Sequence, residues 1–197
     1  MQSSLLVRLG GIAAALGGLM WVVKAVGIML TGDQPPVVFE IAPPFFAIGL
    51  VGLYVRLGGR SKRLGRLGLT LACLAFAAWT GSLPYEVPGD SGSVMSEQFV
   101  FPQSLIILTG FLGILGGLVL LGIATLRTKS LPERWRVMPL AMGLLAFPLM
   151  GVGGAIEPLG ERYIEIPILF LGLAWLVLGY VIWPGIGEKG RQHIPAA

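Results

Sequence analysis

The sequence predicts an all-α, polytopic membrane protein: six transmembrane helices in a compact bundle, with both termini in the cytoplasm. Composition is the first reason for this fold class. Of the 197 residues 55% are hydrophobic and only 12% are charged, and the mean hydropathy is +0.83. Soluble domains carry about 25% charged residues, so lipid is the natural solvent for this chain. The other two reasons are the spacing of the apolar runs and the distribution of charge between them.

Six apolar runs are long enough to cross about 30 Å of hydrocarbon at about 1.5 Å per residue, although the third is at the short limit. They cover residues 5–30, 37–57, 67–83, 104–126, 137–156 and 163–183. The first run is too long for the apolar core of a signal peptide, so we expect an uncleaved first helix. The prediction is one transmembrane domain over residues 1–184 and a short polar cytoplasmic tail over residues 185–197.

Charge is distributed unevenly between the two sides of these runs. One side carries 12 of the 14 basic residues, and the other carries eight of the ten acidic residues. Because cytoplasmic segments of membrane proteins are rich in Lys and Arg, this pattern predicts a plasma-membrane protein with both termini inside. We interpret the basic connection at residues 56–66 as this topology signal. No aromatic residue interleaves with its charges, so we expect no nucleic-acid partner.

The three runs that enter from the outside begin in a similar way. Glu40, Gln103 and Glu165 are 63 and 62 residues apart, and each lies near proline. The helix dipole favours an anion at this end, and we place Pro43 and Pro44 in or just before the first turn, where proline costs little. Two interpretations remain open: three repeated helical hairpins, or start signals shared by helices of one direction. For Glu40 and Glu165 individually we favour the start signal.

Small residues predict how the helices pack against one another. The first run carries Gly10, Ala14 and Gly18 at four-residue spacing, and the fourth carries the pair Gly113 and Gly117. In lipid, such residues let two helix backbones approach closely. We expect them to serve packing within the chain rather than a dimer interface.

The residue types that common active sites require are scarce. The single histidine, His193, lies in the tail, so one chain offers neither a His-based zinc site nor a Ser-His-Asp arrangement. Nothing matches a glycine-rich phosphate loop followed by Lys and Ser or Thr. The single cysteine, Cys73, is expected to be a small buried apolar residue. We therefore predict no enzymatic activity, no metal and no cofactor.

Charged residues at the ends of the apolar runs are the best candidate site. Lys24 lies about 9 Å below the outer end of the first run and shares a helix face with small residues that should pack inward. Glu157 ends the fifth run, where the helix dipole disfavours a carboxylate, and it also shares a close-packing face. We predict that Lys24 and Glu157 form a buried pair or jointly contact a ligand, with Glu40 as the alternative partner of Lys24.

Three functions compete at this stage, and an intramembrane enzyme that uses carboxylates alone is the weakest of them. The favoured one is an accessory or scaffolding subunit of a larger membrane assembly, because the loops are short and catalytic chemistry is absent. The alternative is a transporter or ligand-binding transport subunit for a small solute or lipid-like molecule, with an outward-facing pocket near Lys24 and Glu157. The expected partners are membrane lipids, together with other membrane subunits in the first case or a small-molecule ligand in the second.

Overall fold

The chain is helical over nearly all of its described residues. The computed structural model describes residues 2–33, 35, 38–58, 60–82, 103–156 and 160–183, and the predicted tail at 185–197 lies outside these ranges. The long helices are α1 (Gln2–Thr31), α2 (Val38–Arg56), α3 (Lys62–Ser82), α4 (Gln103–Thr128), α5 (Met138–Ile156) and α6 (Glu165–Ile182). Two short 3-10 helices, η2 (Glu133–Trp135) and η4 (Glu161–Ile164), precede α5 and α6. No strand occurs in the described ranges, and the all-α prediction is confirmed for them.

Five helices are long and apolar enough to cross a membrane, judged by length and composition. The segments are Ser4–Thr31, Arg63–Gly81, Leu108–Thr128, Glu133–Gly153 and Arg162–Ile182. α2 contributes a shorter apolar segment, Ile41–Arg56. The whole of α2 has 19 residues and is therefore about 28 Å long. These helices are compatible with a membrane protein, and the sixth span remains a prediction.

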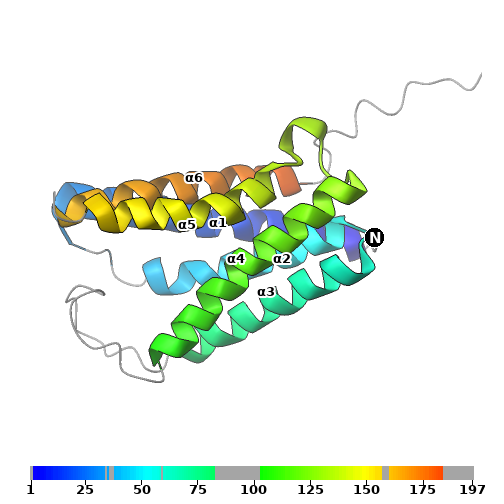
Figure 1. Ribbon diagram of the computed structural model, residues 1–197, viewed down its shortest axis with the longest axis horizontal. Helices are drawn as coiled ribbons and strands as arrows, with labels where there is room; N and C mark the ends of the chain where they lie inside the picture. The colour runs from blue at the N-terminus through cyan, green and yellow to red at the C-terminus, as the bar shows by residue number, and fades with distance from the viewer. Residues whose placement is uncertain are drawn as a thin grey trace, which may run out of the picture.

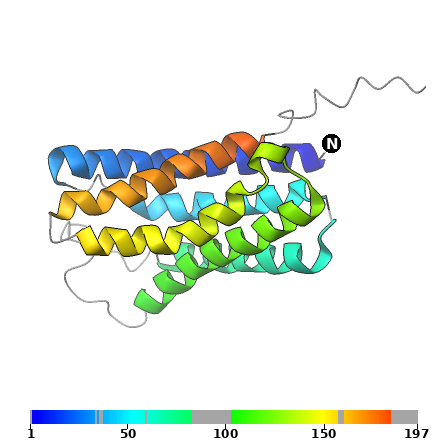
Figure 2. The ribbon, with the colours of Figure 1, turned by 45° about the horizontal axis from the view of Figure 1, so that its top comes forward.

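The long helices lie roughly along one axis and run in alternating directions (Figure 1). α1 and α2 form one antiparallel hairpin and α3 and α4 form a second, whereas α6 packs along the length of α1 (Figure 2). α5 packs mainly on α4 and less on α6. Three equivalent hairpins are therefore not formed, because the main neighbour of the last helix is the first helix rather than α5.

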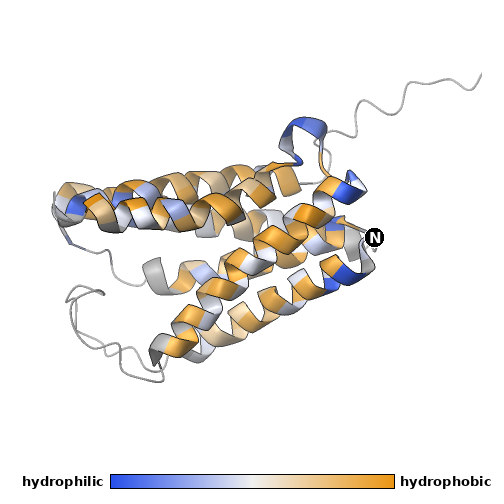
Figure 3. Ribbon diagram, in the orientation of Figure 1, coloured by the Kyte–Doolittle hydropathy of each residue, from blue (hydrophilic) through white to orange (hydrophobic). Residues whose placement is uncertain are grey.

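Hydrophilic residues gather toward the two ends of the bundle, and apolar residues cover the part between them (Figure 3). One end holds the N-terminus, the end of α6, and the α2–α3 and α4–α5 connections (Figure 1). We call it the basic end and the opposite one the distal end. The basic residues in and near the basic end include Arg8, Arg56, Arg60, Lys62, Arg63, Arg66, Arg127, Lys129, Arg134 and Arg136.

Glycine lets the backbone of α1 approach both α6 and α2. A Cβ atom added to Gly18 would lie only 2.6 Å from the carbonyl oxygen of Gly172 on α6. On another face of α1, a Cβ added to Gly52 of α2 would lie 2.6 Å from the Cα of Gly10. In α4, Gly113 faces Leu71 and Ala75 of α3, and Gly117 lies between Leu50 of α2 and Gly68 of α3. The prediction that these small residues pack within the chain is confirmed.

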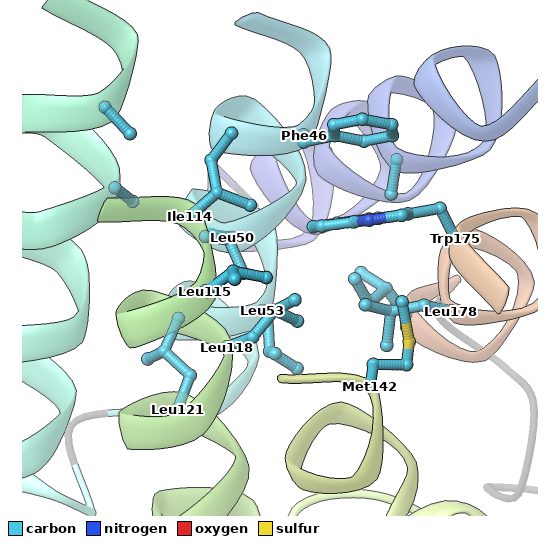
Figure 4. Packing of buried hydrophobic residues seen from close by; sticks show 14 of the residues in the cluster. Phe46, Leu50, Leu53, Ile114, Leu115, Leu118, Leu121, Met142, Trp175 and Leu178 are labelled. Atoms are coloured by element: carbon cyan, nitrogen blue, oxygen red, sulfur yellow. The ribbon is translucent and has the colours of Figure 1, made fainter. Parts of the chain in front are cut away.

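Aromatic rings occupy the centre of the bundle. Phe46 of α2 stacks on Trp175 of α6, with ring centroids 4.3 Å apart and planes at 22° (Figure 4). Trp21 of α1 meets Phe46 edge-on, with centroids 5.0 Å apart and planes at 89°. Both geometries are favourable for aromatic quadrupoles. Figure 4 also shows the aliphatic side chains that continue this core, including Leu50, Leu53, Leu118, Met142 and Leu178.

Two local predictions are wrong. Pro43 and Pro44 lie inside α2 rather than at its first turn, because the helix already begins at Val38. Each proline deprives the carbonyl group four residues earlier of its helical donor, a change that membrane helices tolerate when neighbouring groups compensate.

Cys73 is exposed rather than buried, because α3 packs through the face that carries Ala75 and turns Cys73 away.

Candidate functional site

A buried ion pair joins α1 to the first turn of α6. Lys24 Nζ donates a hydrogen bond to Glu165 Oε1 at 2.8 Å. The two side chains are only 6% and 8% exposed. An ionisable side chain within an apolar helix of this kind is costly unless it is paired, and it usually marks a functional site.

Helix packing sets the register of this pair. α1 and α6 are antiparallel and meet where Gly18 faces Gly172. Six residues further along α1 is Lys24, and seven residues back along α6 is Glu165. The short helix η4 leads directly into α6, so Glu165 falls in its first turn, where the helix dipole favours a carboxylate. Glu165 therefore lies at the helix start, as expected, and also pairs with Lys24.

The structure places the predicted site residues as follows. Lys24 is turned inward and contacts the carboxylate of Glu165, which we had interpreted only as a helix start signal. Glu157 lies outside the described residues. Glu40 lies in the first turn of α2, and its side chain is outside the described part of the chain. The partner was missed because it depends on the register of α1 against α6, which one sequence does not reveal.

Glu40 nevertheless lies in the first turn of α2, close to the level of Lys24. Gly17 of α1 packs against Phe46 and Ala42 of α2. Lys24 lies about two turns after Gly17 on α1. Because α2 runs in the opposite direction, the same distance along the bundle leads from Phe46 back to the first turn of α2. The backbone at Glu40 is thus beside the turn of α1 that carries Lys24.

Two buried polar atoms near the ion pair have no hydrogen-bond partner among the described residues. One is Oε2 of Glu165, whereas the other oxygen of this carboxylate, Oε1, accepts the 2.8 Å hydrogen bond from Lys24. The other is Nε1 of Trp21, which lies one helical turn before Lys24 on α1. Buried polar atoms in folded proteins are nearly all paired, so each exception needs an explanation.

On the basic-end side of the pair lies a small apolar cavity to which all six long helices contribute. Its volume is about 20 Å³. Its walls include the side chains of Trp21, Phe46, Trp79, Met142, Ala146 and Trp175. This space is about that of a single water-sized group. Its aromatic walls suit an apolar group or a flat ring.

On the distal side of the pair lies an open groove of about 700 Å³ between the end of α1 and the start of α6. Arg162, Tyr163 and Ile166 form one wall, and Gly32 belongs to the other. Gly32 has a φ of +86°, and a Cβ there would lie 3.1 Å from Nη2 of Arg162. The positive φ favours glycine at this position, whereas the guanidinium is the end of a flexible side chain that can move aside.

The ion pair occupies the layer between the cavity and the groove. On α1, Trp21 lines the cavity, Lys24 follows one turn later, and Ile28 lines the groove after one more turn. On α6, Ile166 lines the groove directly after Glu165. The two spaces are thus separated along the α1–α6 contact by the charged pair.

Comparisons with protein-family models, with curated proteins and with solved structures find no match for this chain. The site is therefore interpreted from its own geometry. Within the described ranges, no group of three or more His, Cys, Asp or Glu side chains is placed to hold a metal ion. The groups available for recognition here are the ion pair, the aromatic walls and the unpaired polar atoms.

At the basic end, α6 is held by Arg56 of α2. Nη1 of Arg56 donates hydrogen bonds to the carbonyl oxygens of Val181 at 2.7 Å, of Ile182, and of Trp183 at 3.0 Å. The last carbonyl groups of a helix lack intrahelical donors and carry the negative end of its dipole, so a guanidinium stabilises them. Charged side chains therefore tie α6 to α1 at one end and to α2 at the other.

Proposed function

We propose that this chain is a multi-pass protein of the plasma membrane that binds an apolar or amphiphilic molecule, as a ligand-binding or transport subunit. The observation that carries this proposal is the position of the Lys24–Glu165 pair between an open groove and an aromatic cavity. A bundle that only holds partners together has no need of buried charges. Buried charges in membrane helices typically line ligand or ion pathways. The proposed function includes no catalysis.

In this proposal all six long helices cross the membrane, with both termini in the cytoplasm and the groove facing outward. The concentration of Lys and Arg at the basic end supports this orientation. The ligand enters through the groove, passes the ion pair and places its apolar part against Phe46 and Trp175. Since the cavity measures only about 20 Å³, the helices must separate as the ligand enters.

Native mass spectrometry of the protein in its own lipids tests this function. Ala146 lines the cavity and is 1% exposed, so Ala146→Leu should fill the space and abolish retention of the bound molecule. Ala155 lies on the same helix and is exposed, so Ala155→Leu should retain the molecule like the wild type. If no small molecule is retained by the wild type, or if both variants retain it equally, the cavity is not the binding site.

The accessory or scaffolding function is the second candidate, and the exposed face of α3 favours it. Thr70, Cys73, Ala77 and Gly81 lie on this face at intervals of three or four residues, and all four are exposed. A Cβ added to Gly81 would meet nothing within 4 Å. Small residues at this spacing allow a further membrane helix to approach closely.

Cys73 itself provides the test of this second function. A thiol cross-linker applied to native membranes should join Cys73 to a partner subunit and give an adduct of one defined mass. The matched control is Leu144→Cys in a Cys73→Ala background, because Leu144 is exposed on α5. Equal, diffuse cross-linking at both positions would remove the support for an accessory role.

A further inference from the structure

The two unpaired polar atoms near the ion pair indicate the chemistry of the ligand. Glu165 is 6% exposed and Trp21 is 8% exposed, so bulk water does not satisfy either group. An ionised carboxylate oxygen only accepts hydrogen bonds, and an indole nitrogen only donates one. The bond from Lys24 to Oε1 orients the carboxylate and leaves Oε2 as the oxygen without a partner among the described residues. The layer around the ion pair therefore holds one acceptor and one donor that have no partner among the described residues.

We propose that the ligand is an apolar molecule bearing a hydroxyl group, such as a long-chain or isoprenoid alcohol, and that this hydroxyl binds to Glu165 Oε2 and Trp21 Nε1. A hydroxyl both donates and accepts, so one small group satisfies both atoms. An alkylammonium only donates, and a carboxylate only accepts, so either would leave one atom unpaired. This inference rests on the proposed function, because it names the ligand class for the same site.

The spacing along α1 suits a bridging hydroxyl. Trp21 and Lys24 are three residues apart, which is a rise of about 4.5 Å along the helix. The carboxylate of Glu165 lies 2.8 Å from Lys24 Nζ, at the end of the lysine side chain. A single oxygen with two hydrogen bonds of about 2.8 Å spans up to about 5.6 Å. In this proposal one bridging hydroxyl spans an interval of that order between the indole and the carboxylate.

The surroundings explain why the rest of the ligand is apolar. The indole of Trp21 contributes to the cavity wall and packs against Phe46. Trp175 and Met142 continue the same wall toward the basic end. A hydrocarbon chain or flat ring attached to the hydroxyl would contact these side chains, whereas a second polar group would be buried there without a partner.

Competitive photolabelling of the full-length protein in lipid nanodiscs tests the inference. The probe is a long-chain alcohol that carries a diazirine, and the labelled residues are mapped by peptide mass spectrometry. The competitors are 1-dodecanol, dodecane, dodecylamine and dodecanoic acid, compared at equal concentrations in the bilayer. We expect 1-dodecanol to protect the cavity residues about tenfold better than dodecane, because a hydrogen bond to a charged group has about that effect on affinity.

Each outcome separates the two proposals. Equal protection by 1-dodecanol and dodecane would overturn the hydroxyl inference but leave apolar ligand binding intact. Stronger protection by dodecylamine or dodecanoic acid would also overturn it and would identify a charged head group. If none of the four compounds protects the cavity, the proposed function fails as well.

A pair of matched variants locates the hydrogen bond. Trp21→Phe keeps an aromatic ring but removes Nε1, so the preference for 1-dodecanol over dodecane should fall severalfold. Trp135→Phe makes the same change near the basic end, where Nε1 is also buried and without a partner among described residues, and should leave the preference unchanged. An equal preference for 1-dodecanol over dodecane in Trp21→Phe and Trp135→Phe would contradict the inference. Should Trp21→Phe not fold, the wild-type competition series alone decides.

Discussion

Lys24 Nζ and Glu165 Oε1 are 2.8 Å apart, although 141 residues separate them along the chain. The contact ties the first long helix to the last. A buried ion pair gains little over apolar packing of the same shape, because both charges lose their hydration. Removal of one partner is different, since it leaves the other charge buried without that compensation.

The pair should therefore respond differently to single and double substitution. Lys24→Met and Glu165→Gln should each lower the free energy of unfolding by about 3–5 kcal/mol, and the double variant should recover part of that loss. Denaturant unfolding in detergent micelles, followed by circular dichroism, measures all three. Arg162→Met, which removes an exposed cation at the same end, should change stability by less than about 0.5 kcal/mol. Strict additivity of the two single losses would show that the side chains are not coupled.

The close approach of α1 and α6 predicts a large effect from one methyl group. In Gly18→Ala the added Cβ would lie 2.6 Å from both the Gly172 carbonyl oxygen and the Leu176 backbone nitrogen, which side-chain movement cannot relieve. We expect a loss of about 1–3 kcal/mol, the range for overpacking. Gly81→Ala on α3 is the control, because its Cβ meets nothing within 4 Å and alanine favours a helix. Equal melting temperatures for the two variants would refute the packing described above.

Arg56 should stabilise the end of α6. Arg56→Gln removes the guanidinium from three carbonyl oxygens and should cost about 1–2 kcal/mol, a value reduced by the partial exposure of the side chain. Arg56→Lys should recover part of the effect, since an ammonium keeps the charge but loses the planar fork. Hydrogen exchange should accelerate at residues 178–182 in the glutamine variant. The control is Arg60→Gln, at an exposed neighbouring arginine. If exchange at residues 178–182 accelerates equally in Arg60→Gln, Arg56 does not specifically cap α6.

The predicted orientation is open to direct labelling. Cysteines placed singly at Ser61, Ser91 and Ser130 in a Cys73→Ala background should react differently with an impermeant maleimide. Ser61 and Ser130 lie in the connections at the basic end, so only the cysteine at Ser91 should be labelled in intact cells. Permeabilised cells, in which all three should react, provide the control. Labelling of Ser61→Cys or Ser130→Cys in intact cells would invert the proposed topology.

Apolar runs were sufficient to locate the helices within a few residues, because length and hydropathy are properties of the chain itself. The exception is α3, which begins at Lys62 rather than near residue 67, since the helix extends through Arg63 and Arg66. Small residues around Gly18 likewise indicated a packing face. The small residues do not identify the helix that packs against this face, because that depends on contacts between segments far apart in the sequence.

Because the sequence does not reveal which helices are neighbours, it predicted the position of Lys24 but not its contact with Glu165. Lys24 lies on the small-residue face of its helix, and this placement can be derived from a helical wheel. Its pairing with Glu165 requires the register of α1 against α6, which is set by glycine contacts between segments far apart in sequence. The exposure of Cys73 has the same origin, because α3 has apolar residues on several faces and its contacts with α4 and α2 decide which face is buried.

The long separation of Lys24 from Glu165 also has a consequence for biosynthesis. Ribosomes add about 5–20 residues per second, so the 141 intervening positions correspond to about 7–28 s between the two side chains. During that interval α1 must enter the bilayer before Glu165 exists. A lysine in this situation extends its aliphatic stem so that the ammonium reaches the lipid headgroups. In the proposed topology Lys24 turns inward once α6 is inserted, so the position of α1 is fixed only after Glu165 has been synthesised.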